Sequence, residues 1–174
     1  MASSERENLF KQVLADSTGI ILKIVRAFAP ASEDRDDLFQ EIVLQIWNCL
    51  PTFQGNSKAT TWVYRVALNT ALNWQRDERK RRKQSDFTFG TEESLDQRAP
   101  EQRDTESREM VEWLQRQLQS LGPVDRALML MYLEGESYRA IAEVLGMSES
   151  NVGVKLSRIR QRLTDSARRA FDGL

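Results

Sequence analysis

The sequence predicts an all-α protein built from two small helical domains that a flexible acidic linker joins. Apolar residues recur at spacings of three and four wherever a period is present, and no stretch shows the sustained alternation of a β-strand. Residues 84–107 have little helical patterning, are rich in acids, Ser, Thr and Gln, and contain Pro100, which is typical of a linker. We therefore expect an N-terminal domain over residues 5–83 and a C-terminal helix-turn-helix domain over residues 108–172.

Proline and glycine divide the apolar pattern into separate helices. Proline cannot continue a helix, and glycine tolerates the positive φ that a sharp turn requires. Such breaks occur at Pro30, Pro51, Gly55, Gly90, Gly122, Pro123, Gly135 and Gly146. The expected helices cover residues 6–28, 34–50, 60–82, 108–121, 124–134, 138–145 and 149–171.

The residue types that are missing exclude several kinds of chemistry. The chain has no histidine and one cysteine, Cys49, which excludes His-dependent catalytic triads, His-ligated metals, cysteine zinc sites and an internal disulfide. We expect no catalytic residue, no cofactor and no bound metal. No run of about 18 apolar residues could cross a bilayer, and the polar first residues do not resemble a secretory signal, so we expect a cytoplasmic protein without membrane insertion.

Charge is unevenly distributed along the chain, although the net charge is only −1. Residues 58–83 carry eight cations and two acids, a net charge of +6. Residues 151–174 carry six cations and two acids, a net charge of +4. Between them, residues 84–112 carry three arginines and nine acids, a net charge of −6. Basic segments suit nucleic-acid binding, whereas a net charge near zero is unusual for a protein that binds DNA on its own.

Residues 137–163 have the pattern of a DNA-reading helix-turn-helix. Ser137 and Ser148 stand at N-cap positions, and Gly146 supplies the turn between the two helices. At about 100° per residue, one stripe of the second helix is apolar and consists of Val152, Leu156, Ile159 and Leu163. The opposite face could enter a major groove and holds Ser150, Asn151, Val154, Ser157, Arg158 and Gln161. The alternative is an ordinary helical hairpin with a polar surface.

Gly153 and Val154 are unusual residues for the surface of a solvated helix. In a helix interior, glycine costs about 1 kcal/mol relative to alanine. Gly153 therefore indicates that a phosphate or a partner backbone comes close to the helix at this point. Val154 on the outer face suits contact with a thymine methyl group.

The expected helix over residues 60–82 carries a polar stripe separate from its apolar face. The stripe spans about 80° and contains Trp62, Arg65, Asn69, Asn73, Arg76 and Lys80. Cations neutralise phosphates, asparagines pair with base edges, and Trp62 with Tyr64 could stack on an unpaired base. The loop that begins at Phe53 could hold an extruded base. In the alternative interpretation Trp62 and Tyr64 are core residues, the cations are solvated, and the loop is a simple turn.

The expected helix over residues 34–50 opens with acids, which suit a helix N-terminus. Asp37, Gln40 and Glu41 lie outside the apolar line formed by Leu38, Ile42, Ile46 and Leu50. A magnesium site on Asp34, Asp37 and Glu41 is an alternative, but no second acidic cluster faces it. We prefer a surface that docks a partner.

The order of these features resembles the extracytoplasmic-function (ECF) sigma factors, which are short alternative sigma factors of bacterial RNA polymerase. Asp37-Leu-Phe-Gln-Glu-Ile resembles the helix that docks on the polymerase clamp. Residues 53–69, with the cations at 76 and 79–82, resemble the segment that melts and reads the −10 promoter element. Residues 132–160 resemble the helix-turn-helix that reads the −35 element. The family usually has Leu-Pro where this chain has Leu121-Gly122-Pro123.

The resemblance implies three sets of contact residues. Polymerase contacts are expected at Asp37, Leu38, Gln40, Glu41, Gln45 and Trp47. Contacts with the −10 element are expected at Phe53, Asn56, Ser57, Lys58, Thr61, Trp62, Tyr64, Arg65, Asn69, Asn73, Arg76 and Lys80. Contacts with the −35 element are expected at Ser148, Glu149, Ser150, Asn151, Val154, Lys155, Ser157, Arg158 and Arg162. The implied partners are core RNA polymerase, promoter DNA and an anti-sigma factor, with no small-molecule substrate.

The leading hypothesis is therefore an alternative sigma factor, not an enzyme, that binds core polymerase, recognises both promoter elements and promotes melting. One alternative is a stand-alone helix-turn-helix regulator that acts on operator DNA. A third hypothesis is a phosphate-processing enzyme that uses the acids between Asp34 and Glu41. The linker aromatics Phe87 and Phe89 have no role that the sequence assigns.

Overall fold

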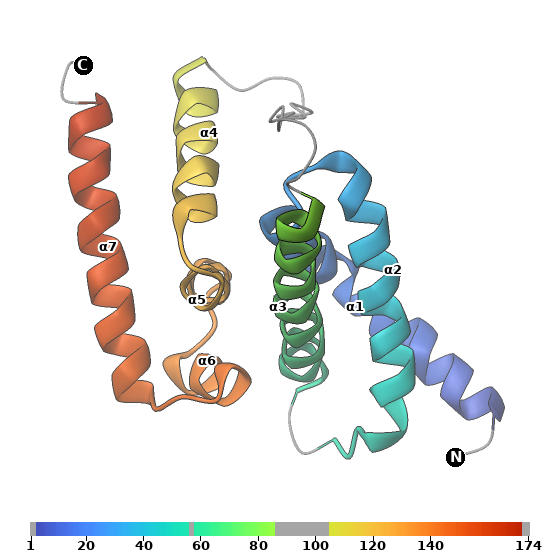
Figure 1. The fold of residues 1–174 in the computed structure, drawn as a ribbon. Coiled ribbons are helices and arrows are strands. Elements are labelled where there is room, and N and C mark those ends of the chain that lie inside the picture. The colour runs from blue at the N-terminus through green and yellow to red at the C-terminus, as the bar shows by residue number, and fades with distance from the viewer. Residues whose placement is uncertain (1–2, 56–57, 86–104, 172–174) are drawn as a thin grey trace. The chain divides into compact units, whose positions relative to one another are not determined.

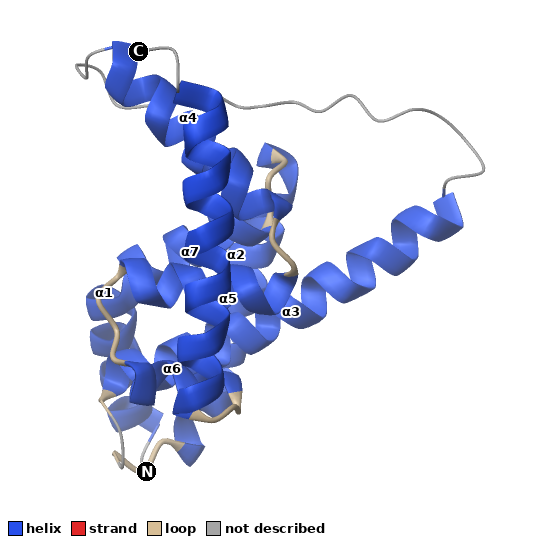
Figure 2. Ribbon diagram, turned by 90° about the vertical axis from the view of Figure 1, so that its left-hand side faces the viewer, coloured by secondary structure: helices blue, strands red, loops and turns tan. Residues whose placement is uncertain are grey.

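The computed structural model describes residues 3–55, 58–85 and 105–171, and every element of regular secondary structure within these ranges is a helix (Figures 1 and 2). The chain divides into two compact units, Met1–Glu101 and Gln102–Leu174. The first contains α1 (Ser3–Phe28), α2 (Ser32–Cys49), the short 3-10 helix η1 (Leu50–Thr52) and α3 (Ala59–Ser85). The second contains α4 (Thr105–Ser120), α5 (Pro123–Leu133), α6 (Tyr138–Leu145) and α7 (Glu149–Phe171). The predicted all-α class is confirmed.

The helices begin and end close to the predicted residues, with two differences beside the predicted linker. Helix α3 continues to Ser85, because Arg, Lys and Gln at its end are good helix formers. Helix α4 begins at Thr105, where Thr and Glu suit the first turn of a helix. Residues 86–104, which include Phe87 and Phe89, lie outside the described residues. The domain boundaries at 83 and 108 stay predictions.

The first unit is a three-helix bundle in which each helix packs against the other two. Its core consists of side chains that are fully buried, among them Ile21, Ile24, Phe28, Leu38, Ile42, Ile46, Val63 and Leu68. Arg35 closes the turn between α1 and α2. Its guanidinium donates from Nε to the carbonyl oxygen of Ala29 at 3.2 Å and from a terminal nitrogen to that of Pro30 at 2.8 Å. These carbonyls at the end of α1 are thereby satisfied.

Helix α5 is the centre of the second unit and packs against α4, α6 and α7. Fully buried side chains from three helices form the core around it, among them Leu128, Met131, Ile141, Val152 and Leu156. The Leu-Gly-Pro sequence begins α5 in a regular way: Gly122 is the N-cap with φ −59° and ψ 155°, and Pro123 follows in the first turn. The extra glycine therefore leaves the helix start intact.

Arg126 is a charged residue that lies inside this core and is only 5% exposed. Its guanidinium donates to three backbone carbonyls at the end of α4: those of Leu118 at 3.1 Å, Gln119 at 2.6 Å and Leu121 at 3.1 Å. Because Gly122, the glycine that follows α4, has φ −59° and not the left-handed conformation, the arginine satisfies carbonyls that a glycine cap would otherwise pair. It thereby fixes the turn from α4 to α5.

We expect Arg126→Ala to lower the free energy of unfolding of the second unit by about 2–4 kcal/mol, because buried carbonyls lose charge-assisted partners. The rate of amide hydrogen exchange in α5, followed at increasing urea concentrations, measures the free energy of unfolding of this unit alone. Arg139→Ala on the exposed side of α6 is the matched control, and its effect should stay within about 0.5 kcal/mol. Equal stability of the two variants would contradict the capping role.

Candidate nucleic-acid and polymerase interfaces

The orientation of α7 follows from its buried stripe. Val152, Leu156 and Ile159 are between 0% and 2% exposed, as the spacing predicted, whereas Leu163 is only half-buried. The opposite face is open to solvent and presents Ser150, Asn151, Val154, Ser157, Arg158 and Gln161. Val154 is 46% exposed, which is high for an apolar side chain. This face can therefore reach a partner, and its contact with DNA stays a prediction.

The turn before α7 has the geometry of a helix-turn-helix. Ser137 begins α6 by accepting a hydrogen bond from the amide of Ala140 at 3.2 Å, and Ser148 does the same for Asn151 at 3.2 Å. Between them, Gly146 has φ +66° and ends α6 in the left-handed conformation. Ala142 is 6% exposed, where a small residue lets the helices approach. The side chains of Ser148 and Glu149 are exposed at the start of α7.

Lys155 differs from the other residues predicted to contact the −35 element. It is half-buried, and its Nζ lies 2.8 Å from Oδ1 of Asp125 in the first turn of α5. The two side chains are 32% and 31% exposed, so the pair is only partly screened by water. Lys155 therefore links α7 to α5 in this structure, and its positive charge is already paired.

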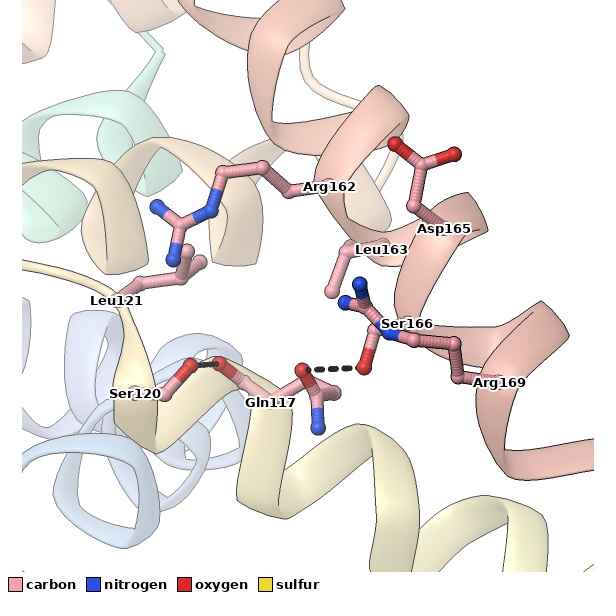
Figure 3. Close-up of a pocket in the computed structure, with 8 residues that line it drawn as sticks. All are labelled: Gln117, Ser120, Leu121, Arg162, Leu163, Asp165, Ser166 and Arg169. Atoms are coloured by element: carbon pink, nitrogen blue, oxygen red, sulfur yellow. Dashed lines mark hydrogen bonds between the residues drawn. The ribbon is translucent and has the colours of Figure 1, made fainter.

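Arg162 borders a pocket of about 190 Å³ between the end of α4 and the C-terminal half of α7 (Figure 3). Its guanidinium points toward Leu121 in this view. Across the pocket, the hydroxyl of Ser166 donates to Oε1 of Gln117 at 3.1 Å, and the hydroxyl of Ser120 donates to the backbone oxygen of Gln117 at 2.7 Å. Arg162 thus lies on the side of α7 that faces α4.

Three residues predicted to contact the −10 element are buried in the first unit. Tyr64 is 2% exposed, Thr61 is 7% exposed and Trp62 is 8% exposed. The ring of Trp62 packs on that of half-buried Phe53, with centroids 5.1 Å apart. The interpretation of Trp62 and Tyr64 as core residues therefore describes this structure, and they are not presented for stacking on a base. The cause is that α3 packs against both α1 and α2, which buries a wide arc of its surface.

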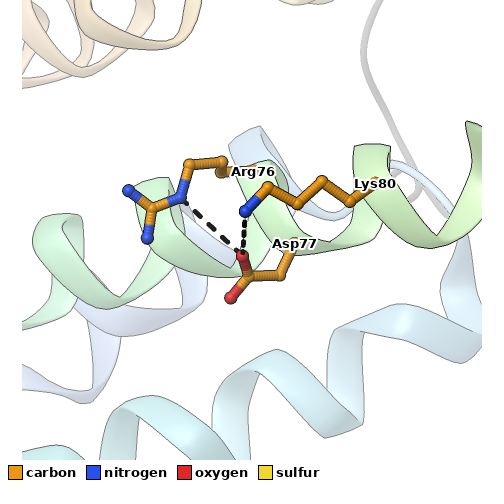
Figure 4. Close-up of polar contacts among 3 residues, drawn as sticks. All are labelled: Arg76, Asp77 and Lys80. Carbon is orange, nitrogen blue, oxygen red and sulfur yellow. Dashed lines mark ion pairs between the residues drawn. The ribbon is translucent and has the colours of Figure 1, made fainter.

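The remainder of the stripe on α3 is open to solvent. Asn69, Asn73, Arg76 and Lys80 are exposed, as is Lys58 just before the helix, and Arg65 is half-buried. Asn56 and Ser57 lie outside the described residues. Arg76 and Lys80 both approach Oδ1 of Asp77, at 3.7 and 3.9 Å, while their side chains stay 64% and 70% exposed (Figure 4). Such long, exposed ion pairs are weak, so both cations can exchange Asp77 for a phosphate.

The predicted polymerase contacts on α2 divide into exposed and packed residues. Asp37, Gln40 and Glu41 are exposed, and the amide of half-buried Gln45 donates to Oε1 of Glu41 at 3.2 Å. Leu38 is 0% exposed, so it belongs to the core and cannot dock a partner in this structure. Its place on the apolar line with Ile42 explains the burial.

Trp47 is half-buried beneath two residues of α1. The Arg6 guanidinium lies 4.1 Å from its ring centroid, and the Phe10 ring meets it edge to face at 5.1 Å. Arg6 also donates a hydrogen bond to the Trp47 carbonyl at 2.7 Å. Trp47 therefore anchors α1 on α2.

Leu44 is a candidate docking residue that the sequence analysis did not select. It is 51% exposed, and it follows Gln40 and Glu41 by about one helical turn, so it shares their side of α2. The sequence offered one signal, because Leu44 belongs to an apolar run that is longer than a single buried stripe requires. An exposed leucine beside two polar residues suits a contact with another protein.

Two structural observations bear on other kinds of function. Among residues 3–55, 58–85 and 105–171, no three His, Cys, Asp or Glu side chains gather as ligands for a metal ion. Within the same ranges no helix combines the length and the apolarity needed to cross a bilayer.

Comparison with known proteins connects both units to one family. The sigma-70 region 2 family matches residues 18–81, and the sigma-70 region 4 family matches residues 111–163. The RNA polymerase sigma factor YlaC of Bacillus subtilis is 33% identical over 135 residues, which are 75% of this chain and 76% of that protein. The ECF RNA polymerase sigma-E factor of Escherichia coli K12 is 28% identical over 151 residues, 82% of this chain and 78% of the relative. The chain belongs to the ECF sigma factors.

Solved structures share the fold of this sigma factor. The sigma factor RpoE of Bartonella quintana, crystallised with the anti-sigma factor NepR, matches with a TM-score of 0.72 at 20% identity, over 90% of this chain and 94% of that one. CnrH in complex with the cytosolic domain of CnrY matches with a TM-score of 0.64 at 21% identity, over 91% and 87% of the two chains. The protein is thus an alternative sigma factor for transcription initiation, and the stand-alone regulator is not favoured.

We expect the pair of Lys155 and Asp125 to contribute to the stability of the sigma factor. A double-mutant cycle with Lys155→Ala and Asp125→Ala, followed by urea unfolding, should give a coupling energy of about 0.3–1 kcal/mol, because both side chains are partly shielded from water. A coupling energy of zero, together with weaker DNA binding by Lys155→Ala alone, would instead make Lys155 a DNA contact.

Proposed function

We propose that this sigma factor binds core RNA polymerase through α2, contacts the −10 element through α3 and reads the −35 element through α7. The observation that carries the proposal is the two-sided character of α7. Val152, Leu156 and Ile159 of its apolar stripe are buried in the core, while a face of Ser150, Asn151, Val154 and Arg158 is left in solvent. Short polar side chains, one exposed aliphatic group and one arginine suit the donor, acceptor and methyl pattern of a major groove.

The −10 contact depends on the exposed part of the α3 stripe. Asn69 and Asn73 offer amides one turn apart, and Arg76 and Lys80 extend the same side of the helix with two cations. Cations fix the DNA backbone, and amides pair with base edges that become accessible when strands open. The buried Trp62 and Tyr64 have a different role on this proposal: they hold α3 in place.

Polymerase is required because neither DNA-contacting surface is strong by itself. A single helix-turn-helix module buries on the order of 600–1,000 Å² with DNA, and the whole chain has a net charge of −1. Two weak contacts held on one large enzyme gain affinity through their high local concentration. The acidic segment between the two matched regions has the charge of a nucleic acid, which suits a path along a basic channel of polymerase.

Three further parts of the proposal concern the cellular setting. The factor itself catalyses no reaction and directs the enzyme to which it binds. It acts in the cytoplasm, where bacterial transcription takes place. An anti-sigma factor holds it inactive; the support for this is that two of its structural relatives were solved in complex with anti-sigma or partner domains.

We expect Arg158→Ala to weaken recognition of the −35 element by about 1–3 kcal/mol, which is the contribution of a bidentate base contact. Run-off transcription with purified core polymerase and a promoter library measures it. Core enzyme with the unchanged factor should initiate at a defined set of promoters, and the variant should lose its selectivity at one base position. Arg168→Ala, exposed near the end of α7, is the control of equal charge. Tight operator binding without polymerase would favour a stand-alone regulator instead.

We expect Glu41→Lys to weaken binding to core polymerase on the order of tenfold, because a charge at an interface is reversed. Competition between the variant and labelled unchanged factor for a limiting amount of core enzyme measures the loss. Glu7→Lys applies the same charge reversal to an exposed position on α1 and should leave competition unchanged. Identical competition by both variants would exclude α2 as the docking surface.

A further inference from the structure

Gly153 lies inside α7, yet nothing in the described part of the chain requires a glycine there. Its φ is not positive, so the backbone suits any residue. A Cβ placed on it would meet only the ring of Tyr138, whose Cε2 would be 3.6 Å away, an ordinary contact distance. Alanine would therefore fit and would favour the helix. The described part of the chain therefore gives no reason for a glycine at this position.

The surroundings of Gly153 combine a bare piece of backbone with groups that suit an anion. Tyr138, at the first residue of α6, is 38% exposed, and its ring centroid lies 6.5 Å from that of Tyr132. The guanidinium carbon of Arg160 lies 5.9 Å from the Tyr132 ring centroid. Arg160 follows Gly153 by seven residues, which is nearly two turns, so both lie on the same side of α7.

This side of α7 adjoins the predicted reading face. Ser150 precedes Gly153 by three residues and Ser157 follows it by four. At about 100° per residue, both serines point within about 60° of the direction of Gly153, and both are exposed. A DNA strand whose bases met that face would have Gly153, Tyr138 and Arg160 at the edge of its path. Ring contact with Tyr132 restrains Arg160, so less entropy is lost when the guanidinium binds a partner.

We propose that one phosphate of the −35 element rests against the bare backbone of Gly153, between the side chains of Tyr138 and Arg160. The inference deepens the proposed function and rests on it. Glycine lets a phosphate approach the helix more closely than any other residue does. Arginine supplies a charge-assisted hydrogen bond, and the tyrosine hydroxyl can donate another. A phosphate held in this way sets the depth at which α7 enters the groove.

Two glycine-to-alanine substitutions separate this role from helix stability. Gly19 also lies in a helix interior, in α1, with no atom within 4 Å of a Cβ placed there. Gly153→Ala and Gly19→Ala should each raise the melting temperature of their own unit, by about 4–8 °C. In holoenzyme assembled from core polymerase and full-length factor, only Gly153→Ala should weaken binding of a fluorescent promoter duplex, by about tenfold.

The salt dependence of the same titration tests the phosphate directly. Arg160→Gln should reduce the slope of log affinity against log salt by about 0.9, the value for one neutralised phosphate. If Gly153→Ala binds the duplex as tightly as Gly19→Ala while Arg158→Ala binds more weakly, the phosphate position is wrong and the proposed function stands. If Gly153→Ala, Arg158→Ala and Arg160→Gln all bind like the unchanged factor, α7 does not read the promoter and both proposals fail.

Discussion

The second unit depends on the burial of one stripe of α7. Val152, Leu156 and Ile159 are almost completely removed from water, and each such side chain contributes about 1.5–3 kcal/mol relative to an exposed one. A rotation of α7 that exposed them would lose several kcal/mol, which is comparable with the stability of a small domain. The buried stripe therefore determines which residues face outward, and the position of Ser150, Asn151 and Arg158 is a consequence of hydrophobic packing rather than of their own contacts.

Arginine side chains fix the helix ends that orient these faces. Arg35 satisfies carbonyls at the end of α1, and Arg126 satisfies three at the end of α4. In each case the guanidinium comes from the following helix, so the cap also fixes the direction in which the chain leaves the turn. A glycine cap would satisfy the carbonyls through the backbone alone and would leave the next helix freer to move. Each arginine thus links local hydrogen bonding to the packing of its unit.

The helices and the outer face of α7 could be predicted because they follow from the period of apolar residues, which is local information. The burial of Trp62 and Tyr64 could not, since burial depends on how many neighbours a helix has, whereas Leu38 stands on the apolar line that the sequence predicted. Periodicity gives the direction of the apolar face of α3 but not the width of the arc that α1 and α2 cover together. The pairing of Lys155 with Asp125, and the capping by Arg126, join residues of different helices, and no spacing rule reports such contacts.

The pair of Lys155 and Asp125 also limits the free positive charge on the outer face of α7 that is proposed to read the promoter. With Lys155 paired, the proposed reading face of α7 has Arg158 as its central charge, among neutral side chains. Non-specific affinity for DNA grows with the number of phosphates that cations neutralise. Amides, hydroxyls and methyl groups that contact base edges add little to this non-specific affinity. A face with few free cations therefore binds random DNA weakly. On the proposed function, such a factor would stay available to polymerase instead of being spread over the genome, and its selectivity would depend on the affinity that the enzyme supplies.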